Sequence, residues 1–380
     1  MKSKKRTLQK KEQRAFGNAD IYSKPSNGTV FSPFVFNIDS MESLILVNFE
    51  KDPDEVYNIL EFQKACEKNG QKRLLAIAYR KDGATDIYYQ PGFPFGSQES
   101  VLNNAVFFER ALEDAKFEVD EDFMEVYFVF EDKTGREIKV RVTEDKREKK
   151  KPFFLLAPVG ANSKRPISLP VYSLYEMSFT KQKHTHIEIE IDKIKHKPDS
   201  FPIPIEWSKN YLTRYSADTF NVDWNKNFKG SLCPLIPDND HRMEDMGITY
   251  ETEERDGHYE IKRMSAKKNK HNITVEFYPA IPDIVCLREE IAIDGNFSII
   301  TDNTSGYIGG RYRVRRQGNE IDFEINPSEG WVPNERRLML KVLFLVVKIF
   351  KEWPKSYVWN AQIKLDDPNR PIMQSAWKRI

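Results

Sequence analysis

The chain has 380 residues, of which 39% are hydrophobic and 12% aromatic, enough for one large or two ordinary hydrophobic cores. Its 59 Lys and Arg residues almost balance its 58 Asp and Glu residues, for a formal net charge of +1. This balance excludes a role that depends on coating an anionic polymer, so we expect no specific nucleic-acid partner. Cys66, Cys233 and Cys286 are odd in number and far apart. They therefore predict neither a disulfide framework nor a zinc ribbon and favour a cytoplasmic location.

The N-terminal residues 1–26 are polar, with seven basic residues among the first fourteen. No apolar stretch follows the basic residues, so the pattern is not that of a secretory signal. A segment of this kind cannot bury enough apolar surface to fold, and we expect a disordered tail. The alternative is a basic anchor to a membrane surface or a nucleic acid.

Short alternating apolar runs begin at Thr29 and continue along most of the chain. A polar residue followed by glycine, placed between two such runs, predicts a hairpin because a two-residue loop requires positive φ. The sequence contains five candidate turns: Asp82-Gly83, Thr134-Gly135, Asp256-Gly257, Asp294-Gly295 and Gln317-Gly318. They predict a mainly β protein built from antiparallel barrels or sandwiches.

The segment 225–247 is rich in Gly, Pro, Asn and Asp and lacks periodicity, so we place a lobe boundary there. The expected lobes are 27–230 and 240–366, with 367–380 as a C-terminal tail. Within the first lobe, residues 101–112 favour a short helix that runs into a strand.

One long apolar segment, 335–352, predicts an α-helix. Asn334 is a suitable cap and Pro354 ends the element. Only a narrow stripe of cationic residues interrupts the apolar surface, and such a helix is normally buried. Its longest charge-free run, Val342–Val347, is too short to cross a membrane. The alternatives are a helix lying on a membrane surface and two buried strands.

The second lobe therefore has hairpin strands, then one late helix, then a closing strand. This order of elements resembles the lipocalin or calycin arrangement, an up-and-down barrel with a late helix. The resemblance covers residues 245–366 and implies a barrel with a ligand pocket, as an analogy of fold alone.

A His-x-His pair, His184 and His186, opens the strand pattern "HTHIEIEID". With Glu190 on the same face, and His196 folding back after a turn, these residues are the candidate metal ligands. The competing interpretation is a half-buried strand with isoleucines inward and charges outward, which explains every residue of the segment. We favour that interpretation and predict no metal and no cofactor.

The segment 211–225 holds the densest group of polar and aromatic residues, the types that line polar pockets. Arg214 is suited to bind a carboxylate or an oxyanion, and Asp218 or Asp223 to act as an acid or base. Tyr215 completes the candidate catalytic group, and Trp224 is a candidate ligand-binding residue. The alternative is an ordinary Arg–Asp ion pair beside a turn.

The strand "RYRVRR" places Arg311 and Arg313 on one face, as candidates to bind an anionic ligand. Glu320 and Glu324 beyond the turn are equally able to neutralise that face. The preceding glycines, Gly309 and Gly310, are followed by a strand and predict a bulge or a close backbone approach rather than a nucleotide site.

These features lead to three hypotheses for the function. The favoured one is a soluble protein that binds a small apolar or anionic molecule in a barrel or between the lobes. The first alternative is an acid–base enzyme of hydratase, isomerase or cyclase type that uses Arg214, Tyr215 and Asp218, with His186 as a further candidate. The second alternative is a peripheral membrane or protein-interaction module.

Overall fold

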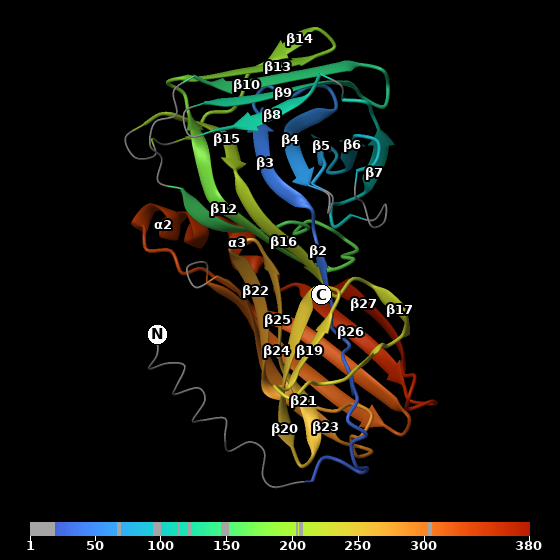
Figure 1. Cartoon of the computed structure of the whole chain (residues 1–380). Coiled ribbons are helices and arrows are strands. Elements are labelled where there is room, and N and C mark those ends of the chain that lie inside the picture. The colour runs from blue at the N-terminus through green and yellow to red at the C-terminus, as the bar shows by residue number, and fades with distance from the viewer. Residues whose placement is uncertain are drawn as a thin grey trace.

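The computed structural model describes residues 20–66, 70–93, 100–112, 114–120, 123–145, 152–202, 204, 208–302 and 306–380. They form two β-rich lobes stacked end to end (Figure 1). The expected mainly β class with two antiparallel β-rich lobes is confirmed.

The N-terminal lobe contains a curled ten-stranded sheet and a five-stranded sheet. In sheet order, the larger one is formed by β2 (Phe36–Ile38), β16 (Asp218–Trp224), β12 (Leu169–Lys181), β15 (Asn210–Ser216), β3 (Met41–Asn48), β4 (Tyr57–Cys66), β5 (Lys72–Arg80), β6 (Thr85–Tyr89) and β7 (Ala105–Glu109), while β11 (Phe153–Ala157) pairs with β12. The smaller one is formed by β14 (Ile194–His196), β13 (Thr185–Ile191), β10 (Glu137–Glu144), β9 (Met124–Glu131) and β8 (Lys116–Val119).

The two sheets of this lobe pack face to face. Side chains alternate along a strand, so Ile45 and Val47 of β3 enter the core between the sheets. Leu44 and Leu46 point the other way, into a hollow described below. The continuous apolar run of β3 thus reflects burial on both faces of the sheet.

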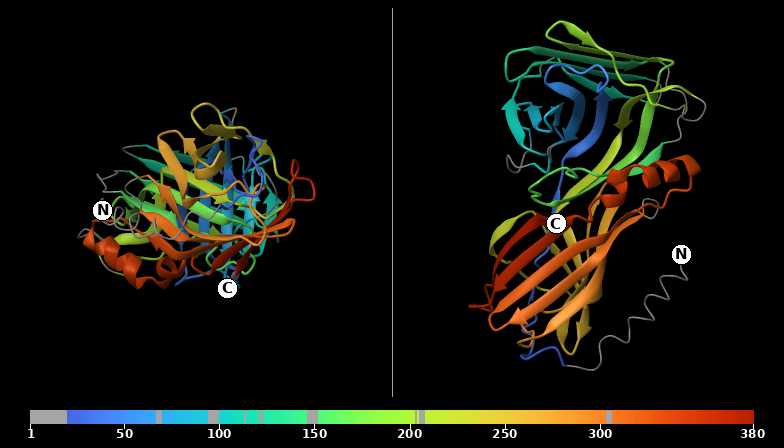
Figure 2. Two further views of the ribbon diagram at one scale, coloured as in Figure 1. Left: turned by 90° about the horizontal axis from the view of Figure 1, so that it is seen from below. Right: turned by 180° about the vertical axis from the view of Figure 1, so that it is seen from behind.

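The C-terminal lobe is one ten-stranded sheet in up-and-down order (Figure 2). Its strands are β19 (Arg242–Asp245), β20 (Ile248–Arg255), β21 (His258–Lys268), β22 (His271–Ile281), β23 (Ala292–Thr301), β24 (Tyr307–Gln317), β25 (Glu320–Val332), β26 (Tyr357–Lys364), β27 (Ile372–Arg379) and β17 (Phe228–Ser231). A two-stranded sheet pairs β1 (Val30–Phe31) with β18 (Pro234–Leu235). Helices α2 (Leu338–Val346) and α3 (Lys348–Glu352) lie between β25 and β26.

The segment from Asp20 to Phe36 runs along the C-terminal lobe. Ile21 and Tyr22 are 5% exposed, and Phe34 is 2% exposed and stacks on Phe277 at 4.8 Å between ring centroids. The prediction of a loose tail over 1–26 is therefore wrong for residues 20–26. Its remaining part, 1–19, lies outside the described residues.

Two expected element assignments are corrected by strand pairing. Residues 105–109 form strand β7, parallel to β6, where a helix was expected at 101–112. The segment 367–380, expected to be a tail, contains β27, which pairs with β26 along its whole length. In both cases, hydrogen bonding to a neighbouring strand of the sheet decides the conformation.

The turn expected at Asp294-Gly295 does not exist, because Gly295 lies within β23 opposite Tyr312. A β-carbon at Gly295 would lie 2.3 Å from the tyrosine ring. The other four predicted turns join consecutive strands, as expected. Because Gly295 has no side chain, the Tyr312 ring can lie against the backbone of β23. Gly309 and Gly310 fulfil the predicted role, since a register shift lies between Gly309 and Arg311 in β24.

The expected helix 335–352 is divided at Val347, which has extended backbone angles. The prediction that this helix is buried is wrong for the side that carries Val342, Leu345 and Val346. Phe344 is 4% exposed, but Val342, Leu345 and Val346 are 49%, 62% and 72% exposed. Among the described residues, none of the helices has the length and apolar character needed to cross a membrane.

Candidate functional site

A large hollow in the described structure has a volume of about 1360 Å³. It lies on the face of the large N-terminal sheet that is turned away from the sandwich core. Its volume exceeds the roughly 300–1,000 Å³ of ordinary small-molecule pockets, so it offers space for a long ligand.

Apolar side chains form most of its wall, and they come from three places. The sheet contributes Leu44, Leu46, Leu75, Ile77, Ile87, Phe107, Leu174, Met177, Phe179 and Leu212; β11 contributes Phe153 and Leu155; and the helical segment contributes Leu343, Phe344, Val347, Ile349 and Phe350. An apolar wall of this kind favours a ligand with a hydrocarbon body.

The strand register places two ionisable side chains, Arg214 and Glu61, in the middle of this wall. Arg214 of β15 lies opposite Leu46 of β3, which lies opposite Glu61 of β4. Glu61 in turn lies opposite Ile77 of β5. Residues directly opposite one another share a face, so this row points into the hollow. Leu60 and Phe62, the sequence neighbours of Glu61, are fully buried in the sandwich core.

Glu61 is held by two hydrogen bonds. The Tyr79 hydroxyl donates to its Oε2 at 2.7 Å, and Nε2 of Gln63 donates to its Oε1 at 2.6 Å. Burial raises the pKa of the Glu61 carboxyl, while these two hydrogen bonds and the Arg214 charge act in the opposite direction. Burial and Glu61 both raise the pKa of the Tyr79 hydroxyl.

Arg214 lies deep in the protein yet keeps some accessible surface, because it borders the hollow. Its Nη1 donates to Oδ1 of Asn48 at 2.7 Å and to the backbone oxygen of Leu212 at 3.2 Å. Among the described residues, no carboxylate lies within ion-pair distance of this guanidinium. Burial lowers the pKa of Arg214, although nearby Glu61 opposes the change. The group is therefore a desolvated cation suited to an anionic or carbonyl oxygen.

A second polar group lines the hollow near the other lobe. Asp223 accepts a hydrogen bond from Ser168 at 2.9 Å and lies 3.4 Å from Nζ of Lys226. Burial raises the pKa values of the carboxyls of Asp223 and Asp39. Burial also raises the pKa of Tyr172, with further contributions from Asp223, Asp39 and Glu61. Tyr172 thus lies within electrostatic range of both polar groups.

The raised pKa of Glu61 gives a pH-dependent prediction. The folded protein favours the neutral acid, so the stabilisation from this group is complete below the unfolded pKa of about 4.3 and is lost as pH rises through the folded value. We expect the wild type to lose stability relative to Glu61→Gln as pH rises above that range. Urea unfolding of both proteins at several pH values measures the difference. Glu125→Gln, a change on the outer face of the sandwich, is the control, and a constant difference between wild type and Glu61→Gln would contradict the prediction.

Two of the five residues predicted in segment 211–225 reach the hollow, namely Arg214 and Asp223. Tyr215 follows Arg214 in β15, so it faces the sandwich core, where it is 3% exposed. Trp224 follows Asp223 and packs between the lobes, with its ring centroid 5.3 Å from that of Phe297.

Asp218 belongs to a polar cluster that joins the two lobes. Its Oδ2 lies 2.8 Å from Nε2 of His271 and 2.9 Å from Nζ of Lys270. Nδ1 of His271 lies 2.9 Å from Oδ2 of Asp302, and Tyr175 stacks on the imidazole at 3.6 Å. Asp218 therefore lies at the contact between the two lobes and does not form a common site with Arg214.

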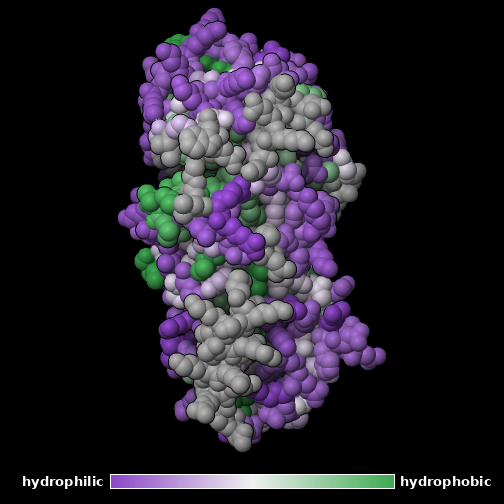
Figure 3. Space-filling model, turned by 90° about the vertical axis from the view of Figure 1, so that its left-hand side faces the viewer, coloured by the Kyte–Doolittle hydropathy of each residue, from purple (hydrophilic) through white to green (hydrophobic). Residues whose placement is uncertain are grey.

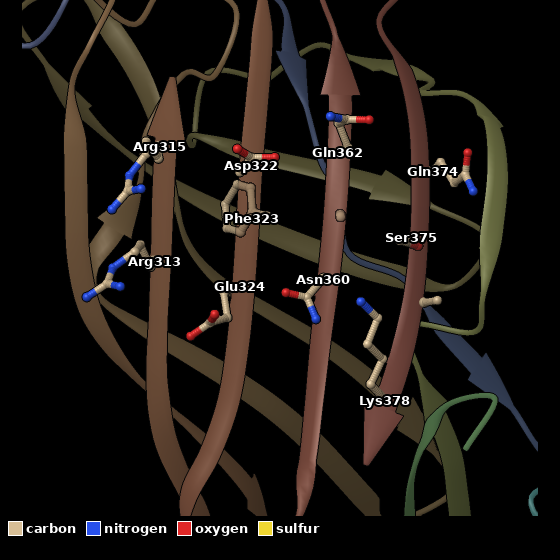
Figure 4. Close-up of a pocket in the computed structure, with 12 residues that line it drawn as sticks. Arg313, Arg315, Asp322, Phe323, Glu324, Asn360, Gln362, Gln374, Ser375 and Lys378 are labelled. Carbon is tan, nitrogen blue, oxygen red and sulfur yellow. The ribbon is translucent and has the colours of Figure 1, made fainter. Parts of the chain in front are cut away.

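The face with Arg311 and Arg313 is the outer face of the C-terminal sheet, where these arginines are exposed. Arg313 and Arg315 border an open hollow of about 460 Å³ there (Figure 4). Glu324 lies opposite Arg313 and Asp322 opposite Arg315, and Nε of Arg313 lies 2.6 Å from Asp294. The positive charge predicted for this face is thus balanced by neighbouring carboxylates.

The histidines at 184–196 are not brought together. His186 and Glu190 lie on the outward face of β13, while Ile187, Ile189 and Ile191 are buried. His184 precedes the strand, 3.5 Å from Asp145, and His196 Nδ1 lies 3.0 Å from the backbone oxygen of Asp52. This is the arrangement of the half-buried strand that the alternation predicts.

Within the described ranges, one group has metal-ligand spacing: His258, Asp283 and Cys286. His258 Nδ1 lies 3.1 Å from Asp283, and the Tyr22 ring stacks on the imidazole at 3.7 Å. Burial, with the neighbouring Asp283, raises the pKa of the Cys286 thiol to about 12. This cluster fastens the N-terminal segment to the C-terminal lobe.

Sequence reasoning missed Glu61 and Tyr79. In "ILEFQ" the glutamate alternates with apolar residues, which is also the pattern of an ordinary strand with one solvent-exposed face. A usable signal lay in the neighbouring strands, where Leu46 and Ile77 place apolar side chains on that same face.

Comparison of the chain with known protein families, curated proteins and solved structures found no match.

Proposed function

We propose that this protein binds a large amphiphilic molecule in the hollow of the N-terminal lobe. The single observation that carries the proposal is the desolvated Glu61–Arg214 row in the mostly apolar wall of a hollow of about 1360 Å³. The hydrocarbon body of the ligand lies against the apolar wall. Its oxygen-bearing head, a carboxylate or carbonyl, is placed at Arg214, which has no carboxylate partner among the described residues.

The first test uses anilinonaphthalene sulfonate, an apolar anion that fluoresces when its surroundings exclude water. Leu46 lies between Arg214 and Glu61, so Leu46→Trp fills the centre of the hollow. We expect the wild type to bind the probe with saturation and Leu46→Trp to lose most of this binding. Val106→Trp, on the exposed outer face of β7, is the matched control and is expected to bind as the wild type does.

Equal binding by all three proteins would contradict the proposal. Cooperative unfolding of each variant, followed by circular dichroism, excludes probe binding to a partly unfolded state. Native mass spectrometry of the purified wild type provides an independent measurement, since a bound amphiphile adds a discrete mass that Leu46→Trp is expected to lack.

The second candidate function is acid–base catalysis on the bound molecule, as in a hydratase, isomerase or cyclase. The observation that favours it is the raised pKa of Glu61 beside the Tyr79 hydroxyl, because a neutral carboxylic acid in a dry site is suited to donate a proton. Of the group named from sequence, Arg214 borders this site. Glu61→Gln keeps the shape but cannot transfer a proton, so a ligand recovered unchanged in mass and isomeric form from both proteins would exclude this candidate.

A further inference from the structure

The helical segment 335–355 presents apolar side chains on two sides. Leu343, Phe344 and Val347 face the hollow, and the Phe344 ring packs on Trp331 at 4.9 Å. Val342, Leu345 and Val346 face outward with about half or more of their surface exposed. Figure 3 shows apolar side chains gathered at mid-height on this side of the molecule. A helix packed on one side normally shows polar residues on the other, so this exposed apolar surface is unusual.

The same segment is cationic, although the whole chain is nearly neutral. It carries six Lys or Arg residues and two Glu residues, for a net charge of +4. Lys341, Lys348 and Lys351 are exposed around the apolar surface. Glu352 lies 3.5 Å from Lys348, and Glu335 is engaged by Arg337 at 3.2 Å. Exposed apolar residues bordered by exposed lysines match the boundary between acyl chains and anionic headgroups.

The segment also joins this surface to the hollow. Arg337 donates to the backbone oxygen of Pro152, and its guanidinium lies 5.8 Å from the Phe153 ring centre, which fixes the start of α2 beside β11. The helices therefore lie where the two lobes meet (Figures 1 and 2), with one apolar side toward the hollow and the other toward the outside. A membrane in contact with the outer side would be separated from the hollow by a single layer of helix.

We infer that α2 and α3 dock the protein on an anionic membrane surface, from which it loads its amphiphilic ligand. The exposed Val342, Leu345 and Val346 enter the acyl boundary, and the lysines bind headgroup phosphates and carboxylates. This inference rests on the proposed function for its ligand, but docking itself is measured without any ligand.

The test is co-sedimentation of the full chain with vesicles of phosphatidylcholine alone or mixed with phosphatidylserine. We expect binding to the mixed vesicles that weakens as salt is added. Lys341→Gln/Lys348→Gln/Lys351→Gln should lower the affinity on the order of a hundredfold, because each lysine near such a surface contributes about fivefold. Val342→Ser/Leu345→Ser/Val346→Ser should also abolish sedimentation with the mixed vesicles.

Matched controls change similar residues elsewhere. Ile194→Ser/Ile236→Ser removes exposed apolar side chains far from the helices in sequence, and Lys195→Gln/Lys262→Gln/Lys364→Gln removes exposed lysines. Both should bind vesicles as the wild type does. Absence of wild-type binding, or equal losses in helix and control variants, would overturn the inference. So would a wild-type dimer in analytical ultracentrifugation that the Ser variant abolishes, because a second copy would then be the occupant.

The vesicle experiment and the probe-binding experiment test the two proposals independently. Saturable binding of anilinonaphthalene sulfonate without vesicle docking leaves the proposed function standing and overturns the membrane inference. Vesicle docking without saturable probe binding overturns the proposed function, and with it the loading step. Transfer of a fluorescent fatty acid from mixed vesicles to protein measures loading directly, and the Ser variant should slow it while its probe binding in solution is unchanged.

Discussion

Replacing Trp224 by alanine is expected to lower the free energy of unfolding by about 3–5 kcal/mol, the usual cost of deleting a large buried aromatic side chain. Trp224 is 0% exposed and belongs to β16 of the N-terminal lobe. Its ring lies 5.9 Å from Phe34, 5.3 Å from Phe297 and 6.3 Å from Trp377, all of which pack in the C-terminal lobe. The cavity left behind would therefore lie between the lobes. Urea unfolding followed by circular dichroism measures the change.

Trp224→Phe is the matched control. The indole N–H of Trp224 is buried without a hydrogen-bond partner among the described groups, so phenylalanine removes an unsatisfied donor while it keeps most of the ring. We expect this variant to lose less stability than Trp224→Ala, because it removes fewer buried atoms and leaves a smaller cavity. A loss below about 0.5 kcal/mol for Trp224→Ala would contradict the assigned packing role, because surface substitutions usually change stability by no more than this.

Replacing Arg214 by methionine is expected to weaken carboxylate binding roughly 10- to 100-fold, since hydrogen bonds to a charged group contribute about 1.5–3 kcal/mol. Oleate should lose this affinity, whereas oleyl alcohol, which has the same hydrocarbon body and no charge, should change much less. Displacement of anilinonaphthalene sulfonate by each compound measures both affinities. Arg214→Lys keeps the charge and should recover part of the oleate binding.

Two controls separate the head-group effect from damage to the fold. Arg313→Gln removes an arginine that lies on the outer face of the C-terminal sheet, and it should leave both affinities unchanged. The melting temperature of Arg214→Met reports whether Asn48, its hydrogen-bond partner, still packs. Equal losses for oleate and oleyl alcohol would show that Arg214 shapes the hollow without binding the head group.

The candidate site was only partly predictable from the sequence. Arg214 was named because arginine among aromatic residues is typical of polar pockets, and it does border the hollow. Tyr215 and Asp218 were named with it, yet the two-residue period turns Tyr215 into the sandwich core, and Asp218 meets His271 of the other lobe. Glu61 and Tyr79 could not be named, because a carboxylate on one strand reveals nothing about which face is solvated until the neighbouring strands are placed.

The structure of the helical segment was also only partly predictable from the sequence. The length of the apolar segment predicted helix at 335–352, and the structure has two helices there. The expected cap, Asn334, is wrong, because α2 begins at Leu338 with Arg337 at its N-cap. Burial was predicted from apolar content alone. The apolar content of a helix does not determine how many other elements pack against it. In the fold, one side of α2 faces Trp331 and the hollow, while the other side packs on none of the described elements.

The sequence by itself determined the mainly β class, four of five predicted turns, the inward isoleucines of β13 and the location of the helices, because these depend on local φ preferences and on a period of two. Tertiary structure alone decided which strand faces enclose a hollow, which charges meet there, and that segment 372–379 completes a sheet. The pairing of strands sets these outcomes, since a one-residue change of register exchanges the two faces of a strand. A buried ligand wall and a solvated face therefore have the same local pattern until the register is fixed.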